Sequence, residues 1–364
     1  MKSKNKYILI IVESPKKCLS IEKWLNDIDK DITYKVVASF GHFCELKRSL
    51  KFIDVKNNYK PTYIVTKKDK LSKLRQMKAG ASEIIIATDM DREGEGIAYH
   101  IITQLKLDPK TTKRIIFNQI TKKSLQEAIK KPTFLDMNLF YAYQARIVLD
   151  IYVGYRVSPL LWLYIENKLS AGRCQSPALS LIHERFIEKD KFESDCFYEV
   201  NTIFGEYSLE GKLTNKLKTD EEIKHLLKII NKSNGIIDNI KNKKSKNSPS
   251  APYITSTLQQ DASNLLGMSP TECMKCAQGL YEKGKTTYMR TDCEDMAEEA
   301  KDEAKETIVD KYGAEYHQTR SFKKKSKNSQ DAHECIRPVD IKIDDVSDDS
   351  EINNRENRLY KLIW

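Results

Sequence analysis

The sequence predicts a multidomain protein that begins with an α/β domain and continues through helical and β-containing segments. The chain has 364 residues, enough for two or three domains of roughly 150 residues each. Over residues 1–130, short apolar runs alternate with amphipathic stretches, which is typical of a parallel or mixed sheet covered by helices. After residue 131 the pattern becomes mainly helical, with one interval of strand-like alternation at 196–253.

The α/β domain is predicted at residues 1–130. Its candidate buried strands are YILIIV, YKVVAS, EIIIAT and RIIF, and its later helix candidates are EGEGIAYHIITQL and TKKSLQEAIKK. A helix is predicted directly after the first strand, because Pro15 favours a helix start and Cys18, Ile21 and Leu25 then share one face.

Three further segments follow. Residues 131–195 are predicted to be helical, with a break at the Ser-Pro pair 158–159 and a second helix capped by Ser176 and led by the next proline. Residues 196–253 are predicted to form strands at CFYEVNTIF and GIIDNI and to end in the basic linker KNKKSKNSPSAP. Residues 254–364 are again mostly helical.

Composition limits the class of protein. Hydrophobic residues make up 40% of the chain, enough to bury a core, which excludes disorder throughout. The net charge of +10 permits an acidic partner such as nucleic acid. No apolar run approaches the ~18 residues of a membrane span, and the run from Tyr7 to Val12 is too short for a signal peptide. We therefore expect an intracellular protein that is not secreted and not in a membrane.

The eight cysteines are spread along the chain, which favours free thiols over a disulfide framework. Cys273 and Cys276 form one CxxC pair, but no second pair lies at the spacing of a zinc ribbon. We expect both thiols to be buried on an amphipathic helix.

The strongest local signal is ATDMDREGEG, which follows the strand EIIIAT. Asp89 and Asp91 lie two apart at a strand end, so a period of two would direct both carboxylates to the same side. Glu93 opens the next helix, and Glu13 ends the first strand in the same manner. Carboxylates at the carboxyl edge of such a sheet suit Mg²⁺, with water and phosphate completing its coordination.

Of two other interpretations of this acidic stretch, the calcium loop is rejected and the acidic turn stays open. The stretch matches the first ligand positions and the glycine of an EF-hand calcium loop, but His100 replaces the bidentate glutamate and a strand precedes the loop. The second alternative is an acidic turn without a ligand.

An ordered series of motifs resembles the type IA DNA topoisomerases, nearest to the bacterial topoisomerase I branch. The motifs are IVESPKK, GHFCEL, TDMDREGEGIAYHI, FNQIT, YQARIVLDIYVGYRVSPLLW, SAGRCQSPALSLI, TLQQDAS, LYEKGKTTYMRTD and DAHECIRP. The resemblance extends from residue 8 to 364. Gln119 stands where the family often has Glu and Met90 where Pro is common, and the GHFCEL stretch is altered, but none of these changes removes a catalytic residue.

The resemblance implies a multidomain topoisomerase core. It assigns a toprim domain to 1–130, the first part of a helical gate domain to 131–195 and the first part of a β-rich arch domain to 196–253. The helical domain that carries the active-site tyrosine follows at 254–364. In the family the chain returns through the arch and gate, so we expect an incomplete toroid and a partner chain that could supply the missing part.

The resemblance also assigns residue roles. Tyr288 is the nucleophile, and Arg290, Glu13 and Lys17 are catalytic, with Lys17 touching the scissile phosphate or protonating the leaving oxygen. Mg²⁺ is assigned to Glu13, Asp89, Asp91 and Glu93. The residues expected to bind single-stranded DNA are His42, Arg92, Arg146, Asp150, Ser170, Arg173, Gln175 and His333.

Residue chemistry supports the Tyr288 assignment. A phenol with a pKa of about 10 must lose its proton before it attacks phosphorus. Arg290 lies two residues further along an extended segment, on the same side, where its guanidinium can stabilise a phenolate and phosphoryl oxygens. Asp150, one helical turn after Arg146, could hold that arginine in place.

The function that the family resemblance implies is ATP-independent, Mg²⁺-dependent breakage of single-stranded or negatively supercoiled DNA through a 5′-phosphotyrosine. Strand passage and religation would follow the breakage. Two alternatives remain: another toprim enzyme, such as a nuclease or primase, and a DNA-binding fragment without strand passage. Residues 279–286, GLYEKGKT, match a P-loop, but a helix precedes the match and an extended segment follows it, the reverse of a P-loop. We therefore expect no ATP.

Overall fold

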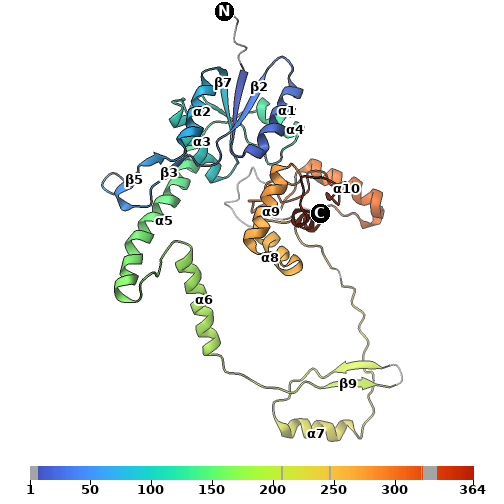
Figure 1. Cartoon of the computed structure of the whole chain (residues 1–364). Helices are drawn as coiled ribbons and strands as arrows, with labels where there is room; N and C mark the ends of the chain where they lie inside the picture. The colour runs from blue at the N-terminus through green and yellow to red at the C-terminus, as the bar shows by residue number, and fades with distance from the viewer. Residues whose placement is uncertain (1–6, 206–207, 246, 321, 323–333) are drawn as a thin grey trace, which may run out of the picture. The chain divides into compact units, whose positions relative to one another are not determined.

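The computed structural model describes residues 7–205, 208–245, 247–320, 322 and 334–364. The chain forms two compact units (Figure 1): Met1–Ala171 with Ser250–Trp364, and Gly172–Pro249. This division is coarser than the four predicted domains, which stay a prediction.

The first unit is built on a sheet of four parallel strands in the order β2-β1-β7-β8. The strands are β1 (Tyr7–Val12), β2 (Tyr34–Ala38), β7 (Ala81–Ala87) and β8 (Lys113–Arg114). The sheet, predicted to be parallel or mixed, is therefore a parallel one. The segment RIIF contributes only its first residue to β8, because the chain leaves the ladder after Ile115 donates to the carbonyl of Ile86 at 2.8 Å.

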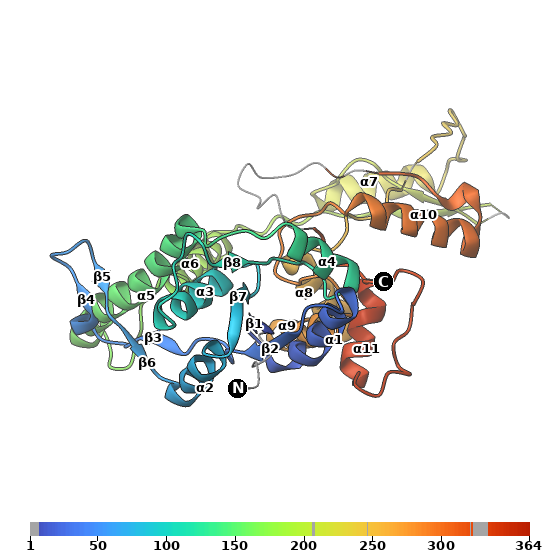
Figure 2. The same ribbon diagram turned by 90° about the horizontal axis from the view of Figure 1, so that it is seen from above.

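Both faces of this sheet are covered by helices, as the alternating pattern predicted. The helices are η1 (Pro15–Lys17), α1 (Cys18–Ile28), α2 (Lys68–Lys78), α3 (Arg92–Gln104) and α4 (Lys122–Lys130). In Figure 2, α2 and α3 lie on one side of the strands and α1 and α4 on the other. Leu9 and Ile11 pack in the cluster of α2 and α3, whereas Ile10 and Val12 pack in the cluster of α1 and α4.

Short strands extend this unit and pack against a long helix. They form two antiparallel pairs, β3 (Cys44–Leu46) with β6 (Tyr63–Val65), and β4 (Ile53–Asp54) with β5 (Lys60–Pro61), and η2 (Leu50–Phe52) precedes β4. Leu46 and Ile53 from these pairs contact Val148 and Ile151 of α5. This contact fixes the middle of α5 against the α/β domain.

Helix α5 (Met137–Tyr164) contains Pro159 and continues past it, so the predicted break at residues 158–159 is wrong. A proline in a helix removes one backbone hydrogen bond, and here that loss falls within a helix of 28 residues. The hydroxyl of Ser158 instead accepts a bond of 3.1 Å from the amide of Ala171, which ties the following loop back to the helix.

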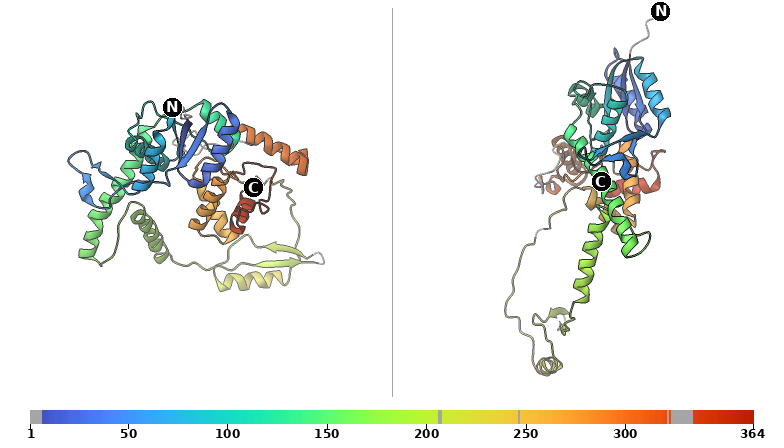
Figure 3. Two further views of the ribbon diagram at one scale, coloured as in Figure 1. Left: turned by 45° about the horizontal axis from the view of Figure 1, so that its top comes forward. Right: turned by 90° about the vertical axis from the view of Figure 1, so that its left-hand side faces the viewer.

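The C-terminal segment of the first unit, residues 250–364, shares a core with the sheet. Its helices are α8 (Thr255–Leu266), α9 (Pro270–Glu282), α10 (Glu298–Tyr312), η3 (Ala314–Tyr316) and α11 (Asn354–Ile363). Leu258, Leu280 and Leu359 belong to the same buried cluster as Ile10 and Val12. The orange and red helices accordingly lie beside the blue α/β domain in both views of Figure 3. Burial of the two cysteines on α9 is confirmed.

The second unit contains α6 (Gln175–Asp190), an antiparallel pair of β9 (Asn201–Phe204) and β10 (Leu209–Lys212), and α7 (Asp220–Ile230). Cys174 precedes the first turn of α6, so Ser176 is not its N-cap. The hydroxyl of Ser176 lies inside that turn and accepts from the amide of Gly172 at 3.1 Å.

Two predictions for residues 196–253 are corrected. The segment GIIDNI forms no strand, and Ile236 is 89% exposed, so no described segment of this unit pairs with it. Helix α7 was not predicted, although Thr219 and Glu222 form a capping box at its start. That Thr-x-x-Glu spacing is a readable sequence signal of a helix start.

Among the described residues, no helix combines the length and apolar character that crossing a bilayer requires.

A core substitution in α9 should weaken the sheet as well. Leu280→Ala removes a side chain with no exposed surface, and we expect a loss of about 2–5 kcal/mol in the free energy of unfolding. Because the cluster is shared, amide exchange should rise in β1 and in α11 together. Leu74→Ala, on the opposite face, is the matched control. Faster exchange confined to α8–α11 would show that the segments fold separately.

Candidate active site

The site forms at the carboxyl edge of the sheet, where parallel strands β1 and β7 both end. Glu13 directly follows β1, and Asp89 and Asp91 follow β7, which ends at Ala87. The strand does not extend through the two aspartates, so the period-two reasoning is wrong in detail. What places Asp91 is its role as the N-cap of α3, where its carboxylate accepts the amide of Gly94 at 2.8 Å.

Gly94 allows this turn to be tight. A Cβ atom at this position would lie 2.0 Å from the carbonyl oxygen of Asp89, a distance that backbone atoms cannot accommodate. The glycine therefore lets the acidic turn fold directly onto the first turn of α3.

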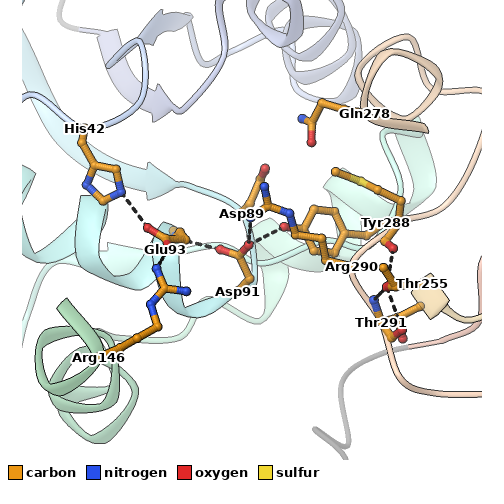
Figure 4. A network of polar contacts seen from close by, with 12 residues as sticks. His42, Asp89, Asp91, Glu93, Arg146, Thr255, Gln278, Tyr288, Arg290 and Thr291 are labelled. Atoms are coloured by element: carbon orange, nitrogen blue, oxygen red, sulfur yellow. Dashed lines mark hydrogen bonds and ion pairs between the residues drawn. The ribbon is translucent and has the colours of Figure 1, made fainter. Parts of the chain in front are cut away.

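Tyr288 and Arg290 both reach the same carboxylate oxygen (Figure 4). The phenol of Tyr288 donates to Oδ2 of Asp91 at 2.7 Å, and Nη1 of Arg290 donates to that oxygen at 2.9 Å. Tyr288 is 3% exposed. The structure thus brings the predicted nucleophile, its predicted supporting arginine and one predicted metal ligand together.

The surroundings of Tyr288 hold its hydroxyl in the protonated form. Burial raises the pKa of the phenol above its usual range, and the charges of Asp91 and Asp89 raise it further, while Arg290 opposes them. A group that stabilises negative charge is therefore needed before the oxygen can act as a nucleophile.

The backbone of Tyr288 is fixed by the FNQIT motif. Its amide donates to the carbonyl of Asn118 at 2.9 Å, and the side chain of Asn118 donates to Glu334 at 2.7 Å. Glu334 is also held by Arg337, whose Nε lies 3.0 Å away. This network joins the α/β domain to the segment that bears Tyr288.

Lys17 and Glu13 are two further charged residues of the acidic cluster around Asp89 and Asp91. The ammonium of Lys17, which is 1% exposed, pairs with Asp89. The pKa of Glu13 is raised to about 7, chiefly by burial and then by the charges of Asp89 and Asp91, whereas Lys17 opposes them. Negative charge is therefore in excess at the edge of the sheet.

Glu93 is paired with residues from two other elements. Its carboxylate lies 3.0 Å from Nε2 of His42 and forms an ion pair with Arg146 of α5. Burial lowers the pKa of His42, and the hydroxyl of Tyr143 lies 3.3 Å from Nδ1 of its ring. In the structure Arg146 thus pairs with Glu93. The predicted link between Arg146 and Asp150 stays a prediction.

A buried ion pair that sequence reasoning missed supports the acidic turn. Arg114 lies 2.8 Å from the carboxylate of Glu95, and both are almost fully buried. Nη2 of Arg114 also donates to the carbonyl of Asp89 at 2.9 Å. The sequence signal for this ion pair was Arg114 itself, which begins the predicted strand RIIF. A charged residue in a buried strand is rare unless it has a partner.

The donor set fits Mg²⁺ in kind. Carboxylate oxygens are the ligands that this ion prefers, and the raised pKa of Glu13 shows charge that a cation would balance. In the described part of the chain, however, no three carboxylate, imidazole or thiol groups lie close enough to hold a metal. Asp89, Asp91 and Glu93 are each paired with a cationic side chain instead.

A cleft of about 570 Å³ opens beside the acidic turn. The residues lining it are Asp91, Arg92, Glu93, Arg146, Ile254, Thr255, Ser256, Gln259, Arg290, Thr291 and Asp292. Sequence reasoning assigned no role to its α8 residues, although Gln259 lies in the motif TLQQDAS. Thr255 begins α8, and its hydroxyl donates to the carbonyl of Met289 at 2.8 Å, which fixes the helix start next to the tyrosine.

Two further predicted DNA-binding residues of the first unit, Asp150 and Ser170, are not among those that line this cleft. Ser170 is exposed in the loop after α5, and Asp150 is exposed on that helix. Arg173 and Gln175 belong to the second unit. His333 lies outside the described residues. For these residues a role in binding stays a prediction.

Comparisons with known proteins place the chain in a family. A family model described as DNA topoisomerase matches residues 135–364, and one described as Toprim domain matches residues 8–120. The chain belongs to the type IA DNA topoisomerase family. It is similar to full-length topoisomerase I from Thermotoga maritima, with 34% identity and a TM-score of 0.80. That match covers 98% of this chain and 59% of the Thermotoga chain.

The P-loop match does not have the required setting in this topoisomerase fold. Helix α9 precedes residues 283–286, and Lys285 pairs with Asp349 at 2.7 Å. A P-loop needs a strand before it and a helix after it. The reversed context predicted from sequence is confirmed.

Glu13 should make stability fall as pH rises. Its pKa lies near 7 in the folded chain against 4.5 in the reference state, so the folded state holds the proton more tightly and is destabilised between these pH values. The upper limit is about 3 kcal/mol, and solvent screening reduces it to about 1–2 kcal/mol. Glu13→Gln should be more stable than the parent at pH 8 and equal to it at pH 4.

Thermal unfolding with and without Mg²⁺ checks this. Mg²⁺ should stabilise the parent at pH 8 and stabilise Glu13→Gln less, because the ion relieves the same excess charge. Glu83→Gln, which alters a carboxylate paired with Lys113 at the other end of β7, is the matched control. Equal pH profiles for the parent and Glu13→Gln would contradict the assignment.

Proposed function

We propose that this chain breaks and rejoins single-stranded DNA through a 5′-phosphotyrosine at Tyr288, without ATP and with Mg²⁺. The observation that carries the proposal is the shared oxygen of Asp91, which binds the phenol of Tyr288 and the guanidinium of Arg290 at the edge of the sheet. The reaction of a toprim nuclease or primase would not require a tyrosine held against the acidic turn.

The cleavage step exchanges one phosphodiester for another. The phenol oxygen of Tyr288 forms a bond to phosphorus, and its proton passes to the carboxylate of Asp91, which already accepts it at 2.7 Å. The bond from phosphorus to the 3′ oxygen breaks, and the ammonium of Lys17 protonates that oxygen. Arg290 stabilises charge on the phosphoryl oxygens. Because one phosphodiester bond replaces another, little free energy is lost, and rejoining needs no nucleotide.

Mg²⁺ would be held by Glu13, Asp89 and Asp91, with Glu93 beside them. When bound, it supplies positive charge that orients the cleaved end and offsets the carboxylates during rejoining. The side chains themselves determine where the proton and the leaving oxygen lie.

The single strand is proposed to enter the cleft beside the tyrosine. Arg92, Arg146 and Arg290 supply positive charge there, and the first turn of α8 adds backbone amides that favour phosphate. Such contacts hold the backbone of a strand without reading its sequence. His42, through Glu93, helps to position Arg146.

Strand passage is proposed to need more than these 364 residues, because the related Thermotoga protein extends well beyond the matched part. A polypeptide of this length is expected to cleave single strands weakly, and further segments or a partner chain would support relaxation of negatively supercoiled DNA. We also propose that the chain is divided into the four predicted domains, namely the toprim, gate, arch and tyrosine domains. We propose further that the protein is intracellular and associated with DNA.

Tyr288→Phe should abolish the covalent adduct and leave binding of a single-stranded oligonucleotide within about threefold, since only the nucleophilic oxygen is lost. The measurement is denaturing gel analysis of a 3′-end-labelled oligonucleotide. Tyr253→Phe, which removes a hydroxyl bonded to Asp261 in the same unit, is the control. An adduct formed by Tyr288→Phe would refute the assignment.

Binding of the single strand should weaken steeply with salt. Each neutralised phosphate contributes about −0.7 to the slope of log affinity against log salt, so five contacts give about −3.5. Arg146→Ala should make the slope less negative by about 0.7. Arg358→Ala, an exposed arginine that contacts Leu266 on α8, should leave it unchanged. A slope near zero for the parent would remove the cleft from the proposal.

A further inference from the structure

We infer that Tyr281 is a positioning residue, whose ring face holds the ammonium of Lys17 where it protonates the leaving oxygen. This inference rests on the proposed function. It concerns a second tyrosine, seven positions before the nucleophile and in the last turn of α9, to which the motif series gave no role.

Tyr281 lies between the two groups that act on the scissile phosphate. It is 1% exposed. Its ring centroid lies 5.1 Å from that of Tyr288, with an angle of 69° between the rings. On its face, Nζ of Lys17 lies 4.6 Å from the centroid. One buried ring therefore contacts both the nucleophile and the proposed general acid.

Among the described residues, Lys17 forms one ion pair. Its ammonium is almost completely buried and pairs with Asp89, a proposed metal ligand. If Asp89 also bound Mg²⁺, that ion pair would weaken, whereas the contact with the face of Tyr281 would not involve the metal. A cation is attracted to the negative face of an aromatic ring, most strongly where water is excluded. The ring thus gives the ammonium a second, uncharged partner.

The neighbouring residues support this reading. Lys16 pairs with Glu282 at 3.2 Å, so two successive lysines of η1 contact two successive residues of α9. Within the described residues, the hydroxyl of Tyr281 donates one hydrogen bond, a long one of 3.4 Å to the carbonyl of Phe117. The ring, and not the hydroxyl, therefore makes the close contacts.

The test compares the rate of adduct formation in the full chain for the parent, Tyr281→Phe and Tyr281→Leu. Tyr281→Phe keeps the ring face and should stay within about threefold of the parent. Tyr281→Leu fills apolar space without a π face and should be about 10- to 100-fold slower, part of the ~10²–10⁴ that a positioned general acid contributes. Oligonucleotide affinity should not change.

Two further measurements separate positioning from simple loss of packing. Tyr360→Leu removes another tyrosine that is 1% exposed in the same cluster, and it should leave the rate nearly unchanged at a temperature where every variant is folded. A substrate with sulfur in place of the bridging 3′ oxygen has a leaving group that needs no proton. On that substrate Tyr281→Leu should recover to within about threefold of the parent.

A double-mutant cycle gives the last check. In a Lys17→Met background, Tyr281→Leu should change the rate by less than about twofold, because the group through which it acts is already gone. Equal rates for the parent and Tyr281→Leu, no recovery on the sulfur substrate, or full additivity with Lys17→Met would each overturn the inference. Absence of any adduct with the parent would instead overturn the proposed function, and this inference with it.

Discussion

The site depends on one oxygen atom of Asp91 that accepts hydrogen bonds from both Tyr288 and Arg290. These bonds join the acidic turn after β7 to a segment nearly two hundred positions further along the chain. The same aspartate caps α3 through the amide of Gly94. A single side chain thus fixes the start of a helix, the position of the phenol and the orientation of the guanidinium.

Ion pairs balance much of the charge in the acidic cluster. Four carboxylates lie at one edge of the sheet, and cationic side chains pair with three of them: Lys17 with Asp89, Arg290 with Asp91 and Arg146 with Glu93. Among the described residues Glu13 forms no such ion pair, and its pKa is raised to about 7. A metal held by Asp89, Asp91 or Glu93 would therefore exchange existing ion pairs.

The junction between the α/β domain and the tyrosine-bearing segment combines an apolar core with polar contacts at its rim. Leu280 and Ile10 belong to one buried cluster, while Asn118 bonds to Glu334 and Lys16 to Glu282 across the junction. Separating these two parts would expose that apolar surface to water. The cost of exposure sets a limit on how readily Tyr288 can leave the acidic turn.

The sequence by itself determined an α/β domain with a parallel or mixed sheet, because short apolar runs that alternate with amphipathic helices dictate strands covered on both faces. It also singled out the acidic turn and Tyr288 as candidates, because the order of motifs is specific. It could not determine that α5 continues past Pro159, that GIIDNI finds no partner strand, or that Arg146 pairs with Glu93. Those outcomes depend on which groups meet in space. Only the tertiary structure decides which partner compensates a hydrogen bond lost at a proline, an unpaired strand edge or a buried charge. Lys17 beneath the ring of Tyr281 is one such buried charge.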